Sequence, residues 1–133
     1  MTLAEAHKRG AVLLRVDGAL QFIPASIAVH VGPVPRVTAL PGSPPELIGV
    51  AVHEGTIVPV VSIGAARAEM VVCQHAGEVL GVVGGQVVRT GVFDIAPGRP
   101  EAVVHDGQTA EAVDLTTIYA RIQASSRPGR WGA

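Results

Sequence analysis

Glycine and proline interrupt this chain so often that long helices do not fit into most of it. The 133 residues include 16 glycines and 10 prolines, and these fall between short runs rich in Val and Ile. Short β-branched runs separated by turn residues are typical of an all-β domain. We therefore expect a mainly β structure, and a chain of this length is sufficient for one domain with its own core.

Turn signals divide the chain into hairpins. Asp17-Gly18 lies between two apolar runs and favours a tight hairpin turn. Similar signals predict further hairpins at residues 53–56, 75–77 and 106–107.

Other glycines and prolines mark irregular positions. Gly84-Gly85 predicts a bulge or break in a strand, and Pro59 predicts an edge or a bulge. Five prolines between residues 32 and 45 exclude a central strand over most of that segment, so we expect a surface loop there.

A helical period appears only near the end of the chain. Leu115, Ile118, Tyr119 and Ile122 are spaced as one face of a helix, and Asp114 or Thr116 is placed to cap its start. We expect an N-terminal extension at 1–10, the domain at 11–124 and a flexible tail at 125–133.

Composition excludes several functional classes. Ten basic and eleven acidic residues give a net charge of −1, and only 3% of residues are aromatic, so a nucleic-acid surface is not expected. No run resembles a signal peptide or a spanning helix. The single cysteine, Cys73, cannot form an intramolecular disulfide, which favours a cytoplasmic location.

No residue pattern indicates catalysis or metal binding. The glycine-rich segment 81–85 lacks the motif of a phosphate loop, and no serine lies in a nucleophile elbow. The Cys73 and His75 pair has no partner at structural-zinc spacing. We therefore expect no enzymatic activity, no metal and no cofactor.

Some predicted strands are apolar on both faces, notably residues 57–61 and 79–83. A solvated antiparallel sheet would alternate apolar and polar residues. Either two small sheets or barrels enclose these strands, or one of their faces meets a partner.

Several short motifs occur in a characteristic order. They are residues 20–24 (LQFIP), 37–41 (VTALP), 47–50 (LIGV), 55–61 (GTIVPVV), 80–83 (LGVV) and 112–115 (AVDL). Their order and spacing resemble the CheW-like domain family over roughly residues 11–122.

The resemblance implies a fold of two small five-stranded SH3-like barrels that share a core, with a C-terminal amphipathic helix. It implies a non-enzymatic adaptor in chemotaxis signal transduction, with no cofactor. The partners it implies are the cytoplasmic hairpin of a methyl-accepting chemoreceptor, held in a groove between the barrels, and the regulatory domain of a CheA-type histidine kinase or other CheW-like proteins.

The chain departs from the family pattern at several positions. Glu54-Gly55 stands where the family usually has Arg-Gly, and Gly84-Gly85 replaces its usual Val-Asp. The connections at 64–69 and 97–101 are short. We infer a shortened, divergent member, and the departures leave open whether it retains both partner contacts or only one.

The resemblance also implies candidate contact residues. Those for the receptor are Val37, Glu54, Gly55, Ile57 and Val82. Those for the kinase, placed at the end of the first barrel, are Val31, Gly32, Val34 and Val61. Two alternatives remain: a generic SH3-like or OB-like module of another assembly, and an enzyme or small-ligand-binding barrel with a deep polar pocket.

Overall fold

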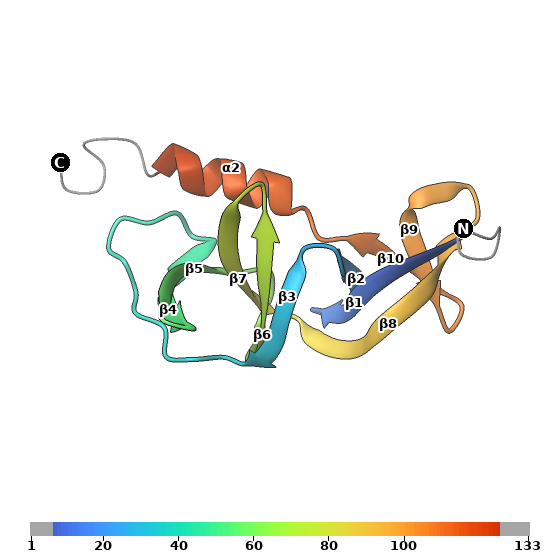
Figure 1. Cartoon of the computed structure of the whole chain (residues 1–133), viewed down its shortest axis with the longest axis horizontal. Helices are drawn as coiled ribbons and strands as arrows, with labels where there is room; N and C mark the ends of the chain where they lie inside the picture. Colours follow the sequence, from blue (N-terminus) through green and yellow to red (C-terminus); the bar gives the residue numbers. More distant parts are fainter. Residues whose placement is uncertain (1–6, 126–133) are drawn as a thin grey trace.

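The computed structural model describes residues 7–125 and is mainly β within that range (Figure 1). The strands are β1 (Lys8–Val16), β2 (Ala19–Pro24), β3 (Ala28–Pro33), β4 (Leu47–His53), β5 (Thr56–Ser62), β6 (Ala66–His75), β7 (Glu78–Gly84), β8 (Gln86–Ala96), β9 (Arg99–His105) and β10 (Gln108–Ala112). A helix, α2 (Leu115–Ser125), follows the last strand.

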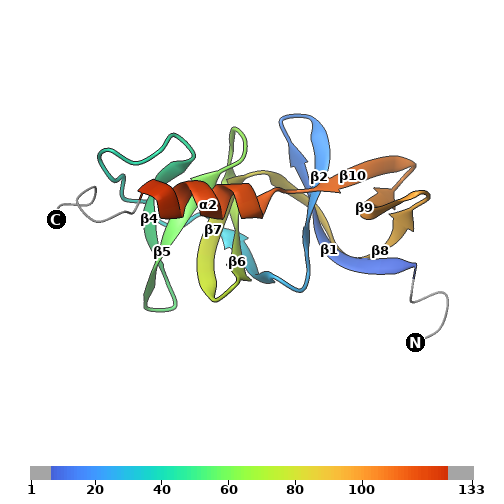
Figure 2. The ribbon, with the colours of Figure 1, turned by 90° about the horizontal axis from the view of Figure 1, so that it is seen from above.

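The strands form two five-stranded units. One is a closed barrel with the order β1-β2-β10-β9-β8, and the other is a sheet with the order β3-β6-β7-β5-β4. The chain therefore starts in the barrel, builds the whole second sheet, and returns to complete the barrel. Figures 1 and 2 show the two units end to end, with α2 lying along the second sheet. The predicted mainly β fold with two five-stranded units and a C-terminal helix is confirmed.

The second unit differs from the expected closed barrel because β3 and β4 do not pair. Pro33 and Pro35 lack the N–H groups that would let the chain after β3 continue a ladder. A single bridge joins the connecting segment to β4, with two backbone hydrogen bonds of 2.8 Å between Thr38 and Val50. The β4 side of this sheet is consequently an edge.

A core shared by the two units explains the strands that are apolar on both faces. Along β1, Ala11 and Leu13 pack inside the barrel, whereas Val12 and Leu14 pack into the shared core. The buried members of the shared core are Val12, Leu14, Val16, Ile23, Leu47, Val61, Val71, Cys73, Leu80, Val82, Val113 and Leu115. A third cluster, which includes Val60, Val72 and Val83, packs on the other face of the second sheet. The sequence left open whether such strands are enclosed on both faces or meet a partner on one face. For β7 the structure shows that both faces are covered within the domain.

The four predicted hairpins are present. The first residue of each two-residue turn is a non-glycine with positive φ, at Asp17, Glu54, Ala76 and Asp106, and the second is a glycine. Positive φ at both positions is the signature of the hairpin turn whose twist matches that of the strands. A fifth hairpin, between β8 and β9 at Pro97-Gly98, was not predicted, although Gly98 has a φ of 71°.

Gly84, at the end of β7, allows a close approach to the connection between β5 and β6 within the second unit. Its φ is 114°, and a Cβ at this position would lie 2.2 Å from the backbone nitrogen of Gly64. The strand break predicted at Gly84-Gly85 is present, since β7 ends at Gly84 and β8 begins at Gln86. Pro59 precedes the first residue of β5 that pairs with β7, so its missing N–H interrupts no ladder there.

The helix begins as predicted. The Thr117 N–H donates to Asp114 Oδ1 at 3.1 Å and caps the first turn. The Thr117 hydroxyl donates to Asp114 Oδ2 at 2.7 Å, and this bond, followed by the backbone bond, lowers the pKa of Asp114. Tyr119 packs against the shared core and donates its hydroxyl to the Glu78 carbonyl at 3.2 Å. Partial burial raises the pKa of Tyr119 to about 12.

Within residues 7–125, no helix has the length and apolar character required to cross a bilayer.

The first strand of the barrel starts before residue 11. β1 begins at Lys8, so three residues assigned to the N-terminal extension belong to the barrel. The predicted flexible tail lies outside the described residues, except for Ser125 at the end of α2.

Gly84→Ala should lower the free energy of unfolding by about 3 to 5 kcal/mol, because it adds a backbone clash to an unfavourable φ. Gly98→Ala is the matched control, since Gly98 has a φ of 71° but no heavy atom within 4 Å of an added Cβ. It should cost only about 1 to 2 kcal/mol. Urea unfolding of both variants would measure the difference, and equal losses would contradict a tight approach at Gly84.

Candidate functional site

Three receptor-side candidates lie together on the β4–β5 hairpin. Glu54 and Gly55 form its turn, and Ile57 is on β5 directly after it. Val37 lies on the segment that flanks β4 and packs partly buried against the cluster that includes Val60. All four belong to the second unit, and β4 is an edge strand of its sheet. Figure 1 shows this hairpin on the side away from the barrel, so these residues do not line a groove between the two units as expected.

An exposed apolar pair stands beside the turn. Val52 and Ile57 are direct cross-strand partners, and they are 62% and 69% exposed. Side chains of cross-strand partners lie on the same face of a sheet, so the two form one apolar surface. Packing within the domain leaves most of both side chains uncovered, so the pair is a candidate contact surface.

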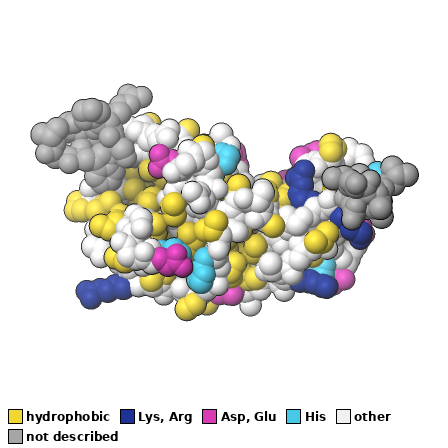
Figure 3. Space-filling view, in the orientation of Figure 1, with side chains coloured by type: hydrophobic (Ala, Val, Ile, Leu, Met, Phe, Trp, Pro, Cys, Tyr) yellow, Lys and Arg dark blue, Asp and Glu magenta, His cyan; other side chains and the backbone are white. Residues whose placement is uncertain are grey.

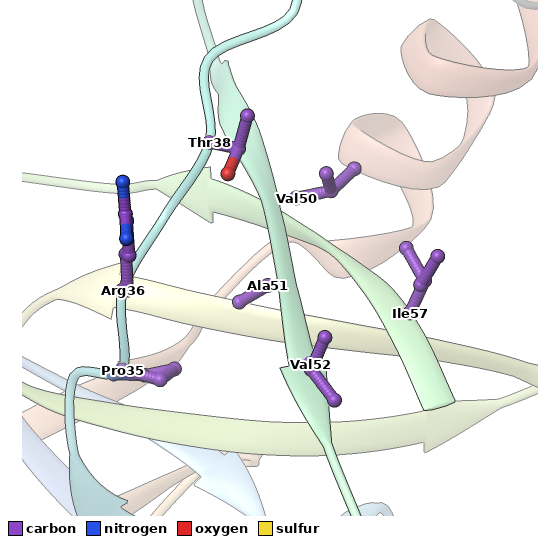
Figure 4. A pocket seen from close by; sticks show the side chains of 7 residues that line it. All are labelled: Pro35, Arg36, Thr38, Val50, Ala51, Val52 and Ile57. Carbon is purple, nitrogen blue, oxygen red and sulfur yellow. The ribbon is translucent and has the colours of Figure 1, made fainter. Parts of the chain in front are cut away.

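This pair forms one side of a surface groove of about 400 Å³, which we call the hairpin groove. Its lining residues are Pro35, Arg36, Thr38, Val50, Ala51, Val52 and Ile57. Figure 4 shows Val52 and Ile57 on neighbouring strands, with Pro35 and Arg36 on the segment that runs beside β4. The groove therefore combines an apolar wall with one guanidinium group.

The turn itself carries an exposed negative charge. The side chain of Glu54 is 84% exposed, and its Oε2 lies 4.0 Å from His53 Nε2. The His53 ring is 5.0 Å from the His30 ring, which brings the open edges of β3 and β4 together at this end. A carboxylate in this position is free to meet charges on a partner.

Two of the candidate residues need correction. Val82 is 2% exposed and Val61 is 0% exposed, because both point into the shared core. Neither side chain can contact a partner in this structure, so both serve to support the strands. The sequence correctly predicted that both residues lie on β-strands. Because these strands are apolar on both faces, their sequence did not indicate which face packs into the shared core.

The other kinase-side candidates belong to the second sheet and not to the first barrel. Val31 and Gly32 are on β3, the edge strand opposite β4, and Val34 follows that strand. Val31 and Val34 are partly buried against two different core clusters. The exposed apolar residue on this strand is Val29, at 56%.

Sequence reasoning missed Val52 and Arg36. A usable signal was present for Val52, since residues equally distant from a two-residue hairpin turn are cross-strand partners. Ile57 was a candidate, and its partner across the turn at 54–55 is Val52. The position of Arg36 had no such signal, because it depends on the path of the proline-rich connection.

A second groove of about 480 Å³, which we call the helix groove, lies between α2 and the β4–β5 side of the sheet. Its lining residues are Leu40, Leu47, Val50, Pro59, Glu78, Ile122 and Gln123. Nearby, Arg121 of α2 forms an ion pair with Glu46. The pKa of Glu46 is lowered by a backbone hydrogen bond and by the Arg121 side chain.

Apolar side chains dominate the surface of the second sheet. In Figure 3, hydrophobic side chains gather over the half that holds β3 to β7, whereas most Lys and Arg side chains visible on this face lie over the barrel.

Among residues 7–125, no group of three or more His, Cys, Asp or Glu side chains is arranged to hold a metal ion. Cys73 is buried, and burial raises the pKa of its thiol to about 12.

Comparison with known proteins gives a structural match only. No protein-family model matches the sequence, and no curated protein sequence matches it. The structure is similar to the crystal structure of the scaffolding protein TtCheW from Thermoanaerobacter tengcongensis, with a TM-score of 0.66 and 15% sequence identity. The similarity covers 80% of this chain and 84% of that chain. The two five-stranded units, the core between them and the C-terminal helix therefore make this chain a CheW-like domain in its fold.

Proposed function

We propose that the protein is a non-enzymatic chemosensory adaptor that links chemoreceptors to a CheA-type histidine kinase in the cytoplasm. The observation that carries this proposal is the exposed Val52–Ile57 pair at a hairpin tip of a CheW-like fold. Apolar residues without an intramolecular partner are typical of protein-binding surfaces. The solved neighbour is itself a scaffolding protein, which supports the same general role.

The receptor contact that we propose uses the hairpin groove. Val52 and Ile57 would bury against apolar residues of the receptor hairpin, with Val37 supporting the flanking segment. Glu54 and Arg36 place opposite charges around this surface, which would determine partner orientation more than affinity.

The kinase contact that we propose uses the opposite edge of the same sheet. Val31, Gly32 and Val34 lie along this edge, together with the exposed Val29. An open strand edge can accept another barrel or strand from a partner. Since the two contacts would use different edges, one can be lost while the other is retained.

Calorimetric titration against the receptor hairpin and the kinase regulatory domain, each measured separately, tests the proposal. Binding to both identifies a coupling adaptor, and binding to the receptor alone identifies an accessory without the kinase contact. Binding to neither would refute the adaptor function and favour a generic protein-binding module of another assembly.

Glu54→Arg should strengthen receptor binding if Glu54 occupies the place of the family's arginine. We expect a gain of about 1 kcal/mol, or roughly fivefold in Kd, that decreases at high salt. Glu54→Gln, which removes the charge without reversing it, should give a smaller gain. Unchanged binding to both receptor and kinase would contradict this placement of Glu54.

Ile57→Ser should weaken receptor binding without destabilising the fold. Loss of an apolar contact of this size should cost about 1.5 to 3 kcal/mol of binding, or roughly 10- to 150-fold in Kd. Because Ile57 is 69% exposed, the melting temperature should remain nearly unchanged. Val92→Ser, at a residue 66% exposed on the barrel, is the matched control and should leave binding intact. Equal effects of the two substitutions would exclude a specific role for the hairpin groove.

A further inference from the structure

The edge of β4 has an open backbone position at Val52. The two hydrogen bonds between Thr38 and Val50 show that the N–H and C=O groups of Val50 point away from β5. Because these groups alternate sides along an antiparallel strand, those of Val52 point the same way. In the β4–β5 ladder Val52 is opposite Ile57, at a position where the two residues exchange no backbone hydrogen bonds. Val52 therefore offers one donor and one acceptor to a further strand.

The segment between β3 and β4 does not occupy this position. The antiparallel register of its single bridge to β4 would set Arg36 opposite Val52, but within residues 7–125 no such pair forms. The start of the segment is held elsewhere, because the Val34 N–H donates to the Ala68 carbonyl of β6 at 3.2 Å. Figure 4 shows the segment diverging from β4 toward Pro35. The hairpin groove is the gap that this divergence leaves.

The side chains around the gap determine what an added strand would carry. A residue of that strand directly opposite Val52 would place its side chain on the same face as Val52 and Ile57. Both of these side chains are mostly exposed and apolar. An apolar residue at that position would therefore bury them and be buried itself.

Charge around the groove adds a second requirement. Arg36 lines the groove, and its guanidinium forms no ion pair with another residue of the described part of the chain. An acidic side chain beside Arg36 would form a charge-assisted hydrogen bond without breaking an existing one. Glu54, at the hairpin turn, is 84% exposed and would repel an acidic side chain at that end. The two charges together favour an acidic residue on the Arg36 side of the groove.

We propose that the β4 edge at Val52 binds an extended peptide segment of another protein by strand addition. An apolar residue of the segment packs against Val52 and Ile57, and an acidic residue next to it pairs with Arg36. This inference goes beyond the proposed adaptor function, since it requires neither the receptor nor the kinase. The bound segment would cover the Val52–Ile57 pair and would exclude the receptor hairpin from the hairpin groove.

Selection of random linear peptides from a displayed library on the full chain tests the proposed chemistry. Peptides selected on the wild type should share an apolar residue next to Asp or Glu, and Arg36→Glu should select Lys or Arg in place of the acidic residue. A synthetic peptide selected on the wild type should bind Arg36→Glu at least about tenfold more weakly in calorimetry. Arg89→Glu, on β8 of the barrel, is the matched control and should behave as the wild type. Enrichment of no sequence, or of the same acidic peptides on Arg36→Glu, would overturn the proposal.

Backbone changes then test strand addition. Only every second residue of an added strand points its N–H at β4, so N-methylation along the peptide should weaken binding by at least about tenfold at alternate residues only. Val52→Pro removes the outward N–H without removing a β4–β5 ladder bond, and it should weaken binding to a similar degree. Val52→Ile keeps both the N–H and the apolar side chain and should bind as the wild type does.

Uniform effects of N-methylation would refute strand addition, because a helical or irregular ligand has no alternation of this kind. Full affinity of a folded Val52→Pro variant would refute it as well. If circular dichroism shows that Val52→Pro does not fold, the N-methylation pattern decides the question by itself. These measurements use peptides alone, so their outcome is separate from that of the titrations against receptor and kinase.

Discussion

The shared core is the constraint on which the rest of the structure depends. Strands of both units send one row of side chains into it, so Val12 and Leu14 from β1 meet residues such as Leu80 and Val82 from β7. Each unit is small, and neither alone would cover both faces of its apolar strands. Burial of apolar surface between them therefore provides the driving force that holds the two units together.

Close contacts and hydrogen bonds between the units then determine their geometry. A Cβ on Gly64, between β5 and β6, would lie 3.0 Å from Val16 Cγ1 and 3.1 Å from Asp17 Oδ2 of the first hairpin, so a side chain there would crowd the barrel. The Ala65 N–H donates to Asp17 Oδ1 at 3.0 Å, and this bond joins the first hairpin of the barrel to the second sheet. Asp17, expected from the sequence to have a turn role, thus also links the two units. These contacts are directional, whereas the hydrophobic effect is not.

The candidate site follows from what the second sheet leaves uncovered. Prolines after β3 stop the chain from pairing with β4, so the sheet stays open and the β4–β5 hairpin projects from its edge. The Val52–Ile57 pair lies on this projection and remains exposed. An apolar pair at an edge, next to an exposed carboxylate, is suited to binding another protein.

The sequence by itself determined the local structure. Its Asp-Gly, Glu-Gly and Ala-Gly turns, its prolines and the helical period after Asp114 all act over a few residues, and the corresponding hairpins and helix are where they were predicted. Only the tertiary structure decided which faces are covered. Val82 and Ile57 both lie on apolar strands, yet one is 2% and the other 69% exposed. The physical reason is that burial depends on contacts between distant segments, which no local pattern specifies.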